Sequence, residues 1–294
     1  MKFTYAVPAG LLAASILFTG CASNNDNSNT SNNNSTNAAA NSTTATNTAA
    51  ATTADFTSAV EQYRTYVIEQ CDEFVKQTEN FTNAVKEDKI DDAKALYAPA
   101  RMYYERIEPI AEALGDLDPN IDARENDVDA AEWRGFHKLE KALWQDNTTK
   151  DMTEVADQLL KDAQLLRAKV ETVEIDANLL VTGAVELLNE VSSSKVTGEE
   201  ERYSHTDLYD FVANVEGAQK IYELLKPELA KKDAELEKTI GERFAALQTE
   251  LAPFKSGDGY VSYEELKEED VRKLSQNLDA LAEPLSNMGT ILGV

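Results

Sequence analysis

His137 and Glu140 are the two residues whose types and spacing point most directly to chemistry. They lie three positions apart in a stretch that we expect to be helical, so both side chains project from one face. An imidazole and a carboxylate at this spacing can bind one metal ion, as histidines and carboxylates do inside helical bundles. Trp133, Phe136 and Trp144 flank the pair, which predicts that it lies at the edge of a buried face. A bound cation would there compensate a charge that is costly to bury.

The spacing alone is a weak signal, because chance and ordinary salt bridges also produce His-x-x-Glu. The second histidine, His205, stands at an expected helix start, where a capping or inter-lobe hydrogen bond competes with a ligand role. The His-Glu-x-x-His pattern of zinc peptidases is absent from the sequence. Residues 254–265 resemble an EF-hand loop, but Phe254 stands where its first aspartate ligand belongs. We therefore expect a turn there and no calcium site.

The composition favours helices and cationic ligands. The chain of 294 residues has 53 acidic and 28 basic residues, a formal net charge of -25. Such an excess of negative charge argues against nucleic acid as a partner, because like charges repel the phosphate backbone. It suits cations, although most of these carboxylates are also explained as solvated faces of helices. Only 12 glycines and 7 prolines occur, which favours helices over sheets and turns.

Residues 1–20 have the features of an export signal. Lys2 precedes a short apolar stretch that ends at Gly20 and Cys21. The stretch is too short to span a membrane, and a small residue before cysteine resembles the lipobox of bacterial lipoproteins. The resemblance implies that Cys21 is acylated and anchors the mature chain to a membrane. An ordinary secretory signal followed by an incidental cysteine is the alternative.

Residues 21–54 contain almost only alanine, asparagine, serine and threonine after the cysteine. They offer no large apolar side chain to bury, so we expect a disordered tether. The second cysteine, Cys71, lies on the apolar stripe of a predicted helix, and we expect it in the core.

Residues 55–294 are predicted to form an all-α domain. Apolar residues from Val60 to Val85 recur at steps of three and four, which is typical of one helix face. Residues 116–128 lack this period and are expected to form an acidic loop. Further helices are expected at about 90–115, 130–146, 151–173, 176–195, 204–225, 227–252 and 263–285, with Pro227 starting one and Ser262 with Glu265 capping the last. Similar stretches around Leu96-Tyr97 and Leu208-Tyr209 suggest two related four-helix lobes.

The segment from Trp133 to Trp144 closely resembles the His-x-x-Glu signature of imelysin-like (M75-type) domains, in particular those of the EfeO/EfeM family. The resemblance extends over about 56–292 and includes residues 104–112, 120–125, 203–208, 215–219, 258–263 and 282–286. It implies an imelysin-like bundle with two pseudo-repeated lobes and a metal site around His137 and Glu140. Many EfeO proteins also carry a cupredoxin domain before the bundle. This sequence matches the shorter EfeM type.

The resemblance also implies further metal ligands and a function. Four carboxylates match acidic positions of the family, although ordinary surface charges would explain them too; they are Glu105, Glu108, Asp122 and Glu216. The implied role is an extracytoplasmic lipoprotein, not an enzyme, which captures Fe²⁺ or Fe³⁺ and delivers it to an Efe-type permease that works with a haem-containing peroxidase. Oxygen-rich donors of this kind also suit Zn²⁺ and other divalent metals, but not Cu⁺.

The sequence leaves two other functions open. The M75 label suggests a metallopeptidase, which would need a base and an open metal position. A surface protein that binds acidic polysaccharide through bridging cations is the second alternative.

Overall fold

The computed structural model of the protein describes residues 55–294, so the predicted signal peptide (1–20), the predicted lipidation site Cys21 and the predicted tether (21–54) lie outside the described residues. The described part is an all-α domain, as predicted. Its α-helices are α1 (Thr57–Lys86), α2 (Ile90–Glu105), α3 (Leu117–Asp122), α4 (Phe136–Trp144), α5 (Thr153–Lys169), α6 (Ala177–Ser193), α7 (Asp207–Lys232), α8 (Ala234–Leu251) and α9 (Glu268–Leu292). Short 3-10 segments cover Glu108–Leu114, Lys195–Thr197, Ala252–Phe254 and Tyr263–Glu265.

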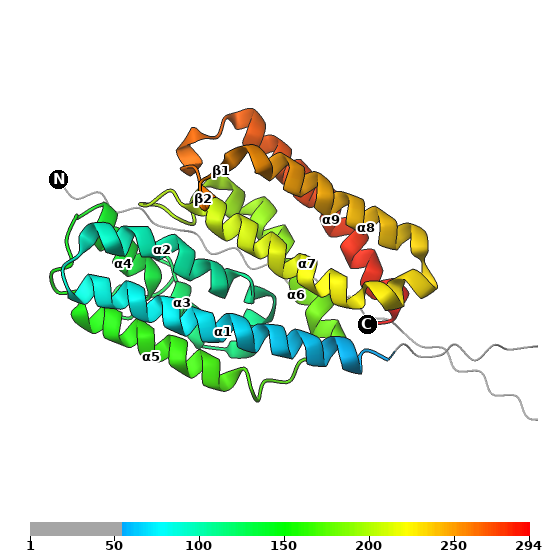
Figure 1. Ribbon diagram of the computed structural model, residues 1–294, viewed down its shortest axis with the longest axis horizontal. Coiled ribbons are helices and arrows are strands. Elements are labelled where there is room, and N and C mark those ends of the chain that lie inside the picture. The colour runs from blue at the N-terminus through cyan, green and yellow to red at the C-terminus, as the bar shows by residue number, and fades with distance from the viewer. Residues whose placement is uncertain (1–54) are drawn as a thin grey trace, which may run out of the picture. The chain divides into compact units, whose positions relative to one another are not determined.

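The helices form two groups (Figure 1). In the first, α1 packs along α2 and α5, and the short α3 and α4 lie against them. In the second, α9 packs along α6 and α8, and α7 lies against both α6 and α8. Contacts of α7 with α2, and of α6 with the segment Glu108–Leu114, join the two groups. The pseudo-repeat between the groups stays a prediction. The helices that carry the two similar stretches, α2 and α7, pack against each other.

The apolar stripe of α1 is buried as its spacing predicts. Tyr63, Val67, Cys71 and Phe74 have no exposed surface. Burial raises the pKa of the Cys71 thiol to about 12. The thiol therefore stays protonated and unreactive, and the prediction that Cys71 is a core residue is confirmed.

An aromatic cluster fixes α4 to the first group of helices. The ring of Phe136, at the start of α4, lies 5.6 Å from Phe81, 5.8 Å from Tyr97 and 5.9 Å from Phe74. Such pairs contribute about 0.5–1.5 kcal/mol each beyond their buried area. The residue that follows Phe136 is His137, so the core holds the backbone that carries the imidazole.

Two expectations around α3 and α4 are wrong. Residues 116–128 were expected to form a loop, but Leu117–Asp122 forms α3 and buries Leu117 and Ile121 on the core. Two apolar residues four apart suffice for one helical turn, yet they are too few to show a period. The helix expected from 130 begins only at Phe136. Gly135 has a φ of 89°, which is not helical, so the helix cannot extend back through this residue.

Two predicted helix starts are also wrong. Pro227 lies inside α7, where the buried Leu225 and Leu229 on either side keep the helix packed, and the break comes at Asp233. The Asp233 carboxylate accepts a hydrogen bond from the Leu236 amide and caps α8. Ser262 caps only a 3-10 turn, and α9 begins after Lys267, whose amide donates to Asp270.

The EF-hand-like stretch is a small hairpin, β1 (Lys255–Ser256) paired antiparallel with β2 (Gly259–Tyr260). This agrees with the expected turn. None of the helices in residues 55–294 combines the length and apolarity needed to cross a membrane.

Substitution of Gly135 by alanine should destabilise the domain by about 3 kcal/mol, because a Cβ there costs both backbone strain and overpacking. The added atom would lie 2.3 Å from the backbone oxygen of Ile121, at a φ of 89°. Denaturant unfolding followed by circular dichroism measures the change.

Gly257→Ala is the matched control. Gly257 also has a positive φ (61°), but a Cβ there meets nothing within 4 Å. We expect the free energy of unfolding to fall by about 1 kcal/mol, from backbone strain alone. If the free energy of unfolding fell equally in the two variants, the result would contradict a close approach of α3 to Gly135.

Candidate metal centre

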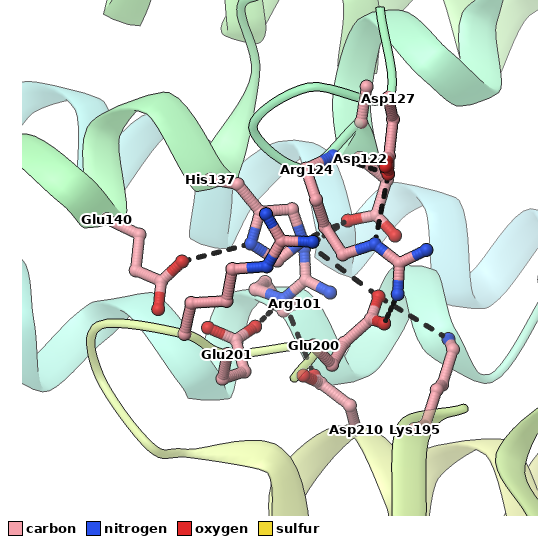
Figure 2. A network of polar contacts seen from close by, with 12 residues as sticks. Arg101, Asp122, Arg124, Asp127, His137, Glu140, Lys195, Glu200, Glu201 and Asp210 are labelled. Carbon is pink, nitrogen blue, oxygen red and sulfur yellow. Dashed lines mark hydrogen bonds and ion pairs between the residues drawn. The ribbon is translucent and has the colours of Figure 1, made fainter. Parts of the chain in front are cut away.

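The imidazole of His137 lies in the first turn of α4, and the residue is only 1% exposed. Its Nδ1 lies 3.0 Å from Glu140 Oε2, one helical turn along (Figure 2). Its Nε2 has no hydrogen-bond partner, although the atom is buried. That nitrogen faces two carboxylates, at 3.6 Å from Asp122 Oδ1 and 3.9 Å from Glu200 Oε1. A buried ring nitrogen without a hydrogen-bond partner, beside two carboxylates, is an arrangement that a metal ion would complete.

Glu140 lies behind the ring and is fully engaged. Its Oε1 accepts hydrogen bonds from the backbone amides of Tyr203 (2.9 Å) and Ser204 (2.8 Å). Burial opposes ionisation of Glu140, but the bond to His137 and the two amides outweigh it and lower its pKa. Carboxylates in this position fix the tautomer and direction of a metal-binding histidine. Glu140 can therefore hold Nδ1–H and leave Nε2 free for an ion.

Two sets of side chains bring potential ligand atoms within 4.8 Å of one another. One set is Asp122, His137 and Glu200, and the other is His137, Glu140 and Glu201. The first set uses the unpaired Nε2, whereas the second would use the Nδ1 already bonded to Glu140. Metal bonds of roughly 2.1 Å place the ligand atoms of one ion roughly 3–4 Å apart, so the first set needs little movement to bind.

A buried arginine holds these acids together. The guanidinium of Arg101, fully buried on α2, forms ion pairs with Glu105, Asp122, Glu201 and Asp210. Its Nε lies 2.6 Å from Glu201 Oε1 but is not aligned for a hydrogen bond. The guanidinium also lies over the rings of Tyr97 and Phe136, at 5.9 and 5.6 Å. Arg101 therefore joins the polar cluster to the aromatic core.

The acids of the cluster differ strongly in their affinity for protons. Burial raises the pKa of Asp122 to about 6 and that of Asp210 to about 8, although Arg101 opposes both shifts. Burial also raises the pKa of Glu201. Burial acts on Glu105 too, but Lys195 and Arg101 outweigh it and lower its pKa to about 2. The neighbouring cations thus compensate Glu105, while the other acids lack full compensation and would gain from an added cation.

A cleft of about 360 Å³ leads to this cluster. Asp122 and Glu200 form part of its lining and are nearly buried, with side chains 10% and 4% exposed. The exposed acids along the cleft are Asp127, Glu186 and Glu190. Arg124 bridges Asp127 and Glu200 at 3.0 and 2.9 Å. Successive carboxylates along a cleft concentrate cations by their field.

The structure brings together only part of the predicted ligand set. His137 and Asp122 meet, and Glu140 supports them from behind. Glu105 and Glu108 are close by, but both carboxylates are held by Lys195 and Asn214.

The predicted ligand Glu216 and the second histidine lie elsewhere. Glu216 is exposed, pairs with Arg106 at 2.7 Å and lines a separate hollow with Tyr66 and Tyr103. The side chain of His205 is 37% exposed and lies 3.8 Å from Glu264, outside both ligand sets.

Sequence reasoning missed Glu200, Glu201, Arg101, Asp210 and Lys195. Arg101 could have been found, because it stands four residues after Tyr97 on the apolar stripe of α2, where a charge needs a buried partner. Asp210 likewise interrupts a buried stretch of α7. Glu200 and Glu201 follow Glu199 in a run of identical residues, and the local pattern does not separate the buried pair from its neighbour.

Known proteins resemble this chain over the whole site. The family model described as imelysin (peptidase M75) matches residues 59–288. An Efem/EfeO family lipoprotein of Staphylococcus haemolyticus (strain JCSC1435) is 47% identical over 293 residues, which cover 97% of this chain and 98% of that protein. Efem/EfeO family lipoproteins of Staphylococcus aureus strains NCTC 8325 and MW2 are each 50% identical over 244 residues, 81% of this chain and 86% of theirs.

The metal-free domain should lose stability as the pH rises from about 5.5 to 8, because its folded form then holds protons that the unfolded chain has released. Asp122 and Asp210 have folded pKa values above those of free aspartate, so the folded state binds more protons in this window. His137 acts in the same direction: burial and Arg101 favour its neutral ring, but Glu140 and Asp122 outweigh them and raise its pKa. Calorimetry with a chelator should show Tm falling by about 4 °C or more.

Asp210→Asn removes one titrating group and should make the fall in Tm smaller. A Tm that stays level or rises over this window in the unsubstituted protein would mean that these acids are already ionised at pH 5.5.

Proposed function

This chain belongs to the imelysin (peptidase M75) family, and from that membership and the site geometry we propose that it captures iron outside the cytoplasm and delivers it to a membrane permease. The family and the names of its Efem/EfeO relatives support a role related to iron uptake. In this proposal the metal is cargo, bound reversibly in the acidic cleft.

The observation that carries the proposal is the unpaired Nε2 of His137. A buried ring nitrogen without a partner costs about 1–3 kcal/mol, which a bound cation would recover. Asp122 and Glu200 are the oxygen ligands nearest to that nitrogen, at 3.6 and 3.9 Å. One imidazole with several carboxylates is a hard donor set, which favours Fe²⁺, Fe³⁺ or Zn²⁺ over Cu⁺. The cleft supplies the route of entry.

We propose that Glu140 positions the ring and does not bind the ion. Its carboxylate is already shared between His137 and two backbone amides. This differs from the sequence-based hypothesis, in which His137 and Glu140 bind the ion jointly. Under the present proposal the carboxylate ligands come from α3 and from the segment before α7.

The lipoprotein relatives support an extracytoplasmic, lipid-anchored location for this chain. We propose Cys21 as the anchor, which would keep the domain close to its permease. A haem-containing peroxidase is a further partner that the family resemblance implies.

The site supports binding better than hydrolysis, despite the name of the family. A metallopeptidase needs an open metal position and a free general base beside it. Glu140 is the nearest candidate base, and both its oxygens are engaged. His205 belongs to neither ligand set that contains His137, so the two do not form the histidine pair of a zinc peptidase.

Anaerobic titration of the purified domain with Fe²⁺ tests the proposal. His137→Ala and Asp122→Asn each remove a ligand and should weaken binding by about 100-fold, or roughly 2.7 kcal/mol. Glu140→Gln, which disturbs only the orientation of the ring, should weaken binding by about 10- to 100-fold.

Two variants serve as controls. Glu237→Gln removes a carboxylate that pairs with Lys226 away from the cleft, and Glu216→Gln removes the exposed carboxylate beside Arg106. Both should bind Fe²⁺ like the unsubstituted domain. Unchanged Fe²⁺ affinity in His137→Ala and Asp122→Asn would refute the site. A loss of Fe²⁺ affinity in Glu216→Gln would instead favour the ligand set that the family resemblance implied.

A further inference from the structure

The side chain of Lys195 already occupies a carboxylate cradle beside the proposed metal position. Its Nζ lies 3.0 Å from Glu105 Oε2 and 2.9 Å from both oxygens of Glu108. The side chain is only 3% exposed, although lysine is rarely buried without partners. Its ammonium thus occupies a place that a free cation would also favour.

The cradle is built by more than the two acids. Asn214, buried on α7, donates from Nδ2 to Glu105 Oε2 at 2.9 Å and to Glu108 Oε2 at 2.7 Å. These bonds hold both carboxylates toward Lys195. Asn214 would still donate to both carboxylates if the ammonium moved away, so the shape of the cradle does not depend on the lysine alone.

Glu200 links the cradle to the proposed metal position. Its Oε1 lies 3.9 Å from His137 Nε2 and also 3.9 Å from Lys195 Nζ. Figure 2 shows Glu200 between the ring and the lysine. An ion bound by His137, Asp122 and Glu200 would therefore lie near the positive charge of Lys195 and would compete with it for the same oxygen.

We propose that Lys195 is a tethered competitor for the cargo ion, which neutralises the acids of the empty cleft and weakens metal binding enough for the ion to be released. The inference rests on the proposed function, and it adds the residue that sets the affinity of the cleft for the cargo ion. On metal binding the ammonium gives up Glu200 and shifts on its flexible four-carbon stem.

An acceptor for the displaced ammonium already lies in the cleft. Glu190 and Glu108 both line it, and Glu190 is exposed. The lysine can therefore move outward along carboxylates without becoming an unpaired buried charge.

Lys195→Met tests the inference, because it keeps the length of the stem and removes the charge. Fe²⁺ titration under anaerobic conditions should show binding at least tenfold tighter than in the unsubstituted domain. A lysine with a merely structural role predicts the opposite sign, since its loss would disorder the acids and weaken binding. The metal-free variant should also melt at a lower temperature and gain more from added Fe²⁺.

Lys195→Arg keeps the charge and should bind no more tightly than the unsubstituted domain. Lys226→Met removes an equal charge from a surface pair with Glu237 and controls for net charge. Should Lys195→Met fail to fold, as judged by circular dichroism, Lys195→Gln carries the same test, because it is also uncharged and keeps a hydrogen-bond donor.

The outcomes separate this inference from the proposed function. Iron binding by the unsubstituted domain with equal or weaker binding by Lys195→Met would overturn the competitor role and leave iron capture intact. Binding by Lys195→Met alone would support the competitor and count against iron capture by the natural chain. Absence of binding in both would refute both proposals.

Discussion

The candidate site depends on the burial of several carboxylates around one guanidinium. Acids removed from water repel one another and favour their protonated forms unless a cation is close. Arg101 supplies that cation, and it stays charged because arginine does not lose its proton in proteins. Its ion pairs draw together α2, α3, α7 and the segment that carries Glu201. The remaining excess of acid would favour a further positive ion in the cleft.

The polar cluster packs directly against the apolar core. The guanidinium of Arg101 rests on the rings of Tyr97 and Phe136, and Phe136 directly precedes His137. Glu140 then fixes the ring through Nδ1. The direction of Nε2 is thus determined by aromatic packing and by the backbone amides of Tyr203 and Ser204, which lie in the turn before α7. Pre-organisation of this kind reduces the ordering cost of binding.

Local pattern predicts the helical class, the buried stripe of α1 and the meeting of His137 with a carboxylate, because each depends on residues a few positions apart. It does not predict which distant acids join them. Glu200 and Glu216 are alike in the sequence, yet the first is buried in the cleft and the second is exposed beside Arg106. Their difference arises from how α7 and the segment before it pack on α2, a long-range contact. The same limit explains Pro227, which the packing of α7 tolerates within the helix.

The partners of the site are far apart along the chain. Glu140 is bonded to the amides of residues 203 and 204, and Glu105 is paired with Lys195, 90 positions later. Contacts with such sequence separation carry an entropy cost, since a long loop must close before any of them contributes. A chain truncated or stalled before residue 195 would keep the imidazole but lack Glu200, Glu201 and Lys195. The complete candidate site therefore belongs to the finished molecule and has no counterpart on a partly synthesised one.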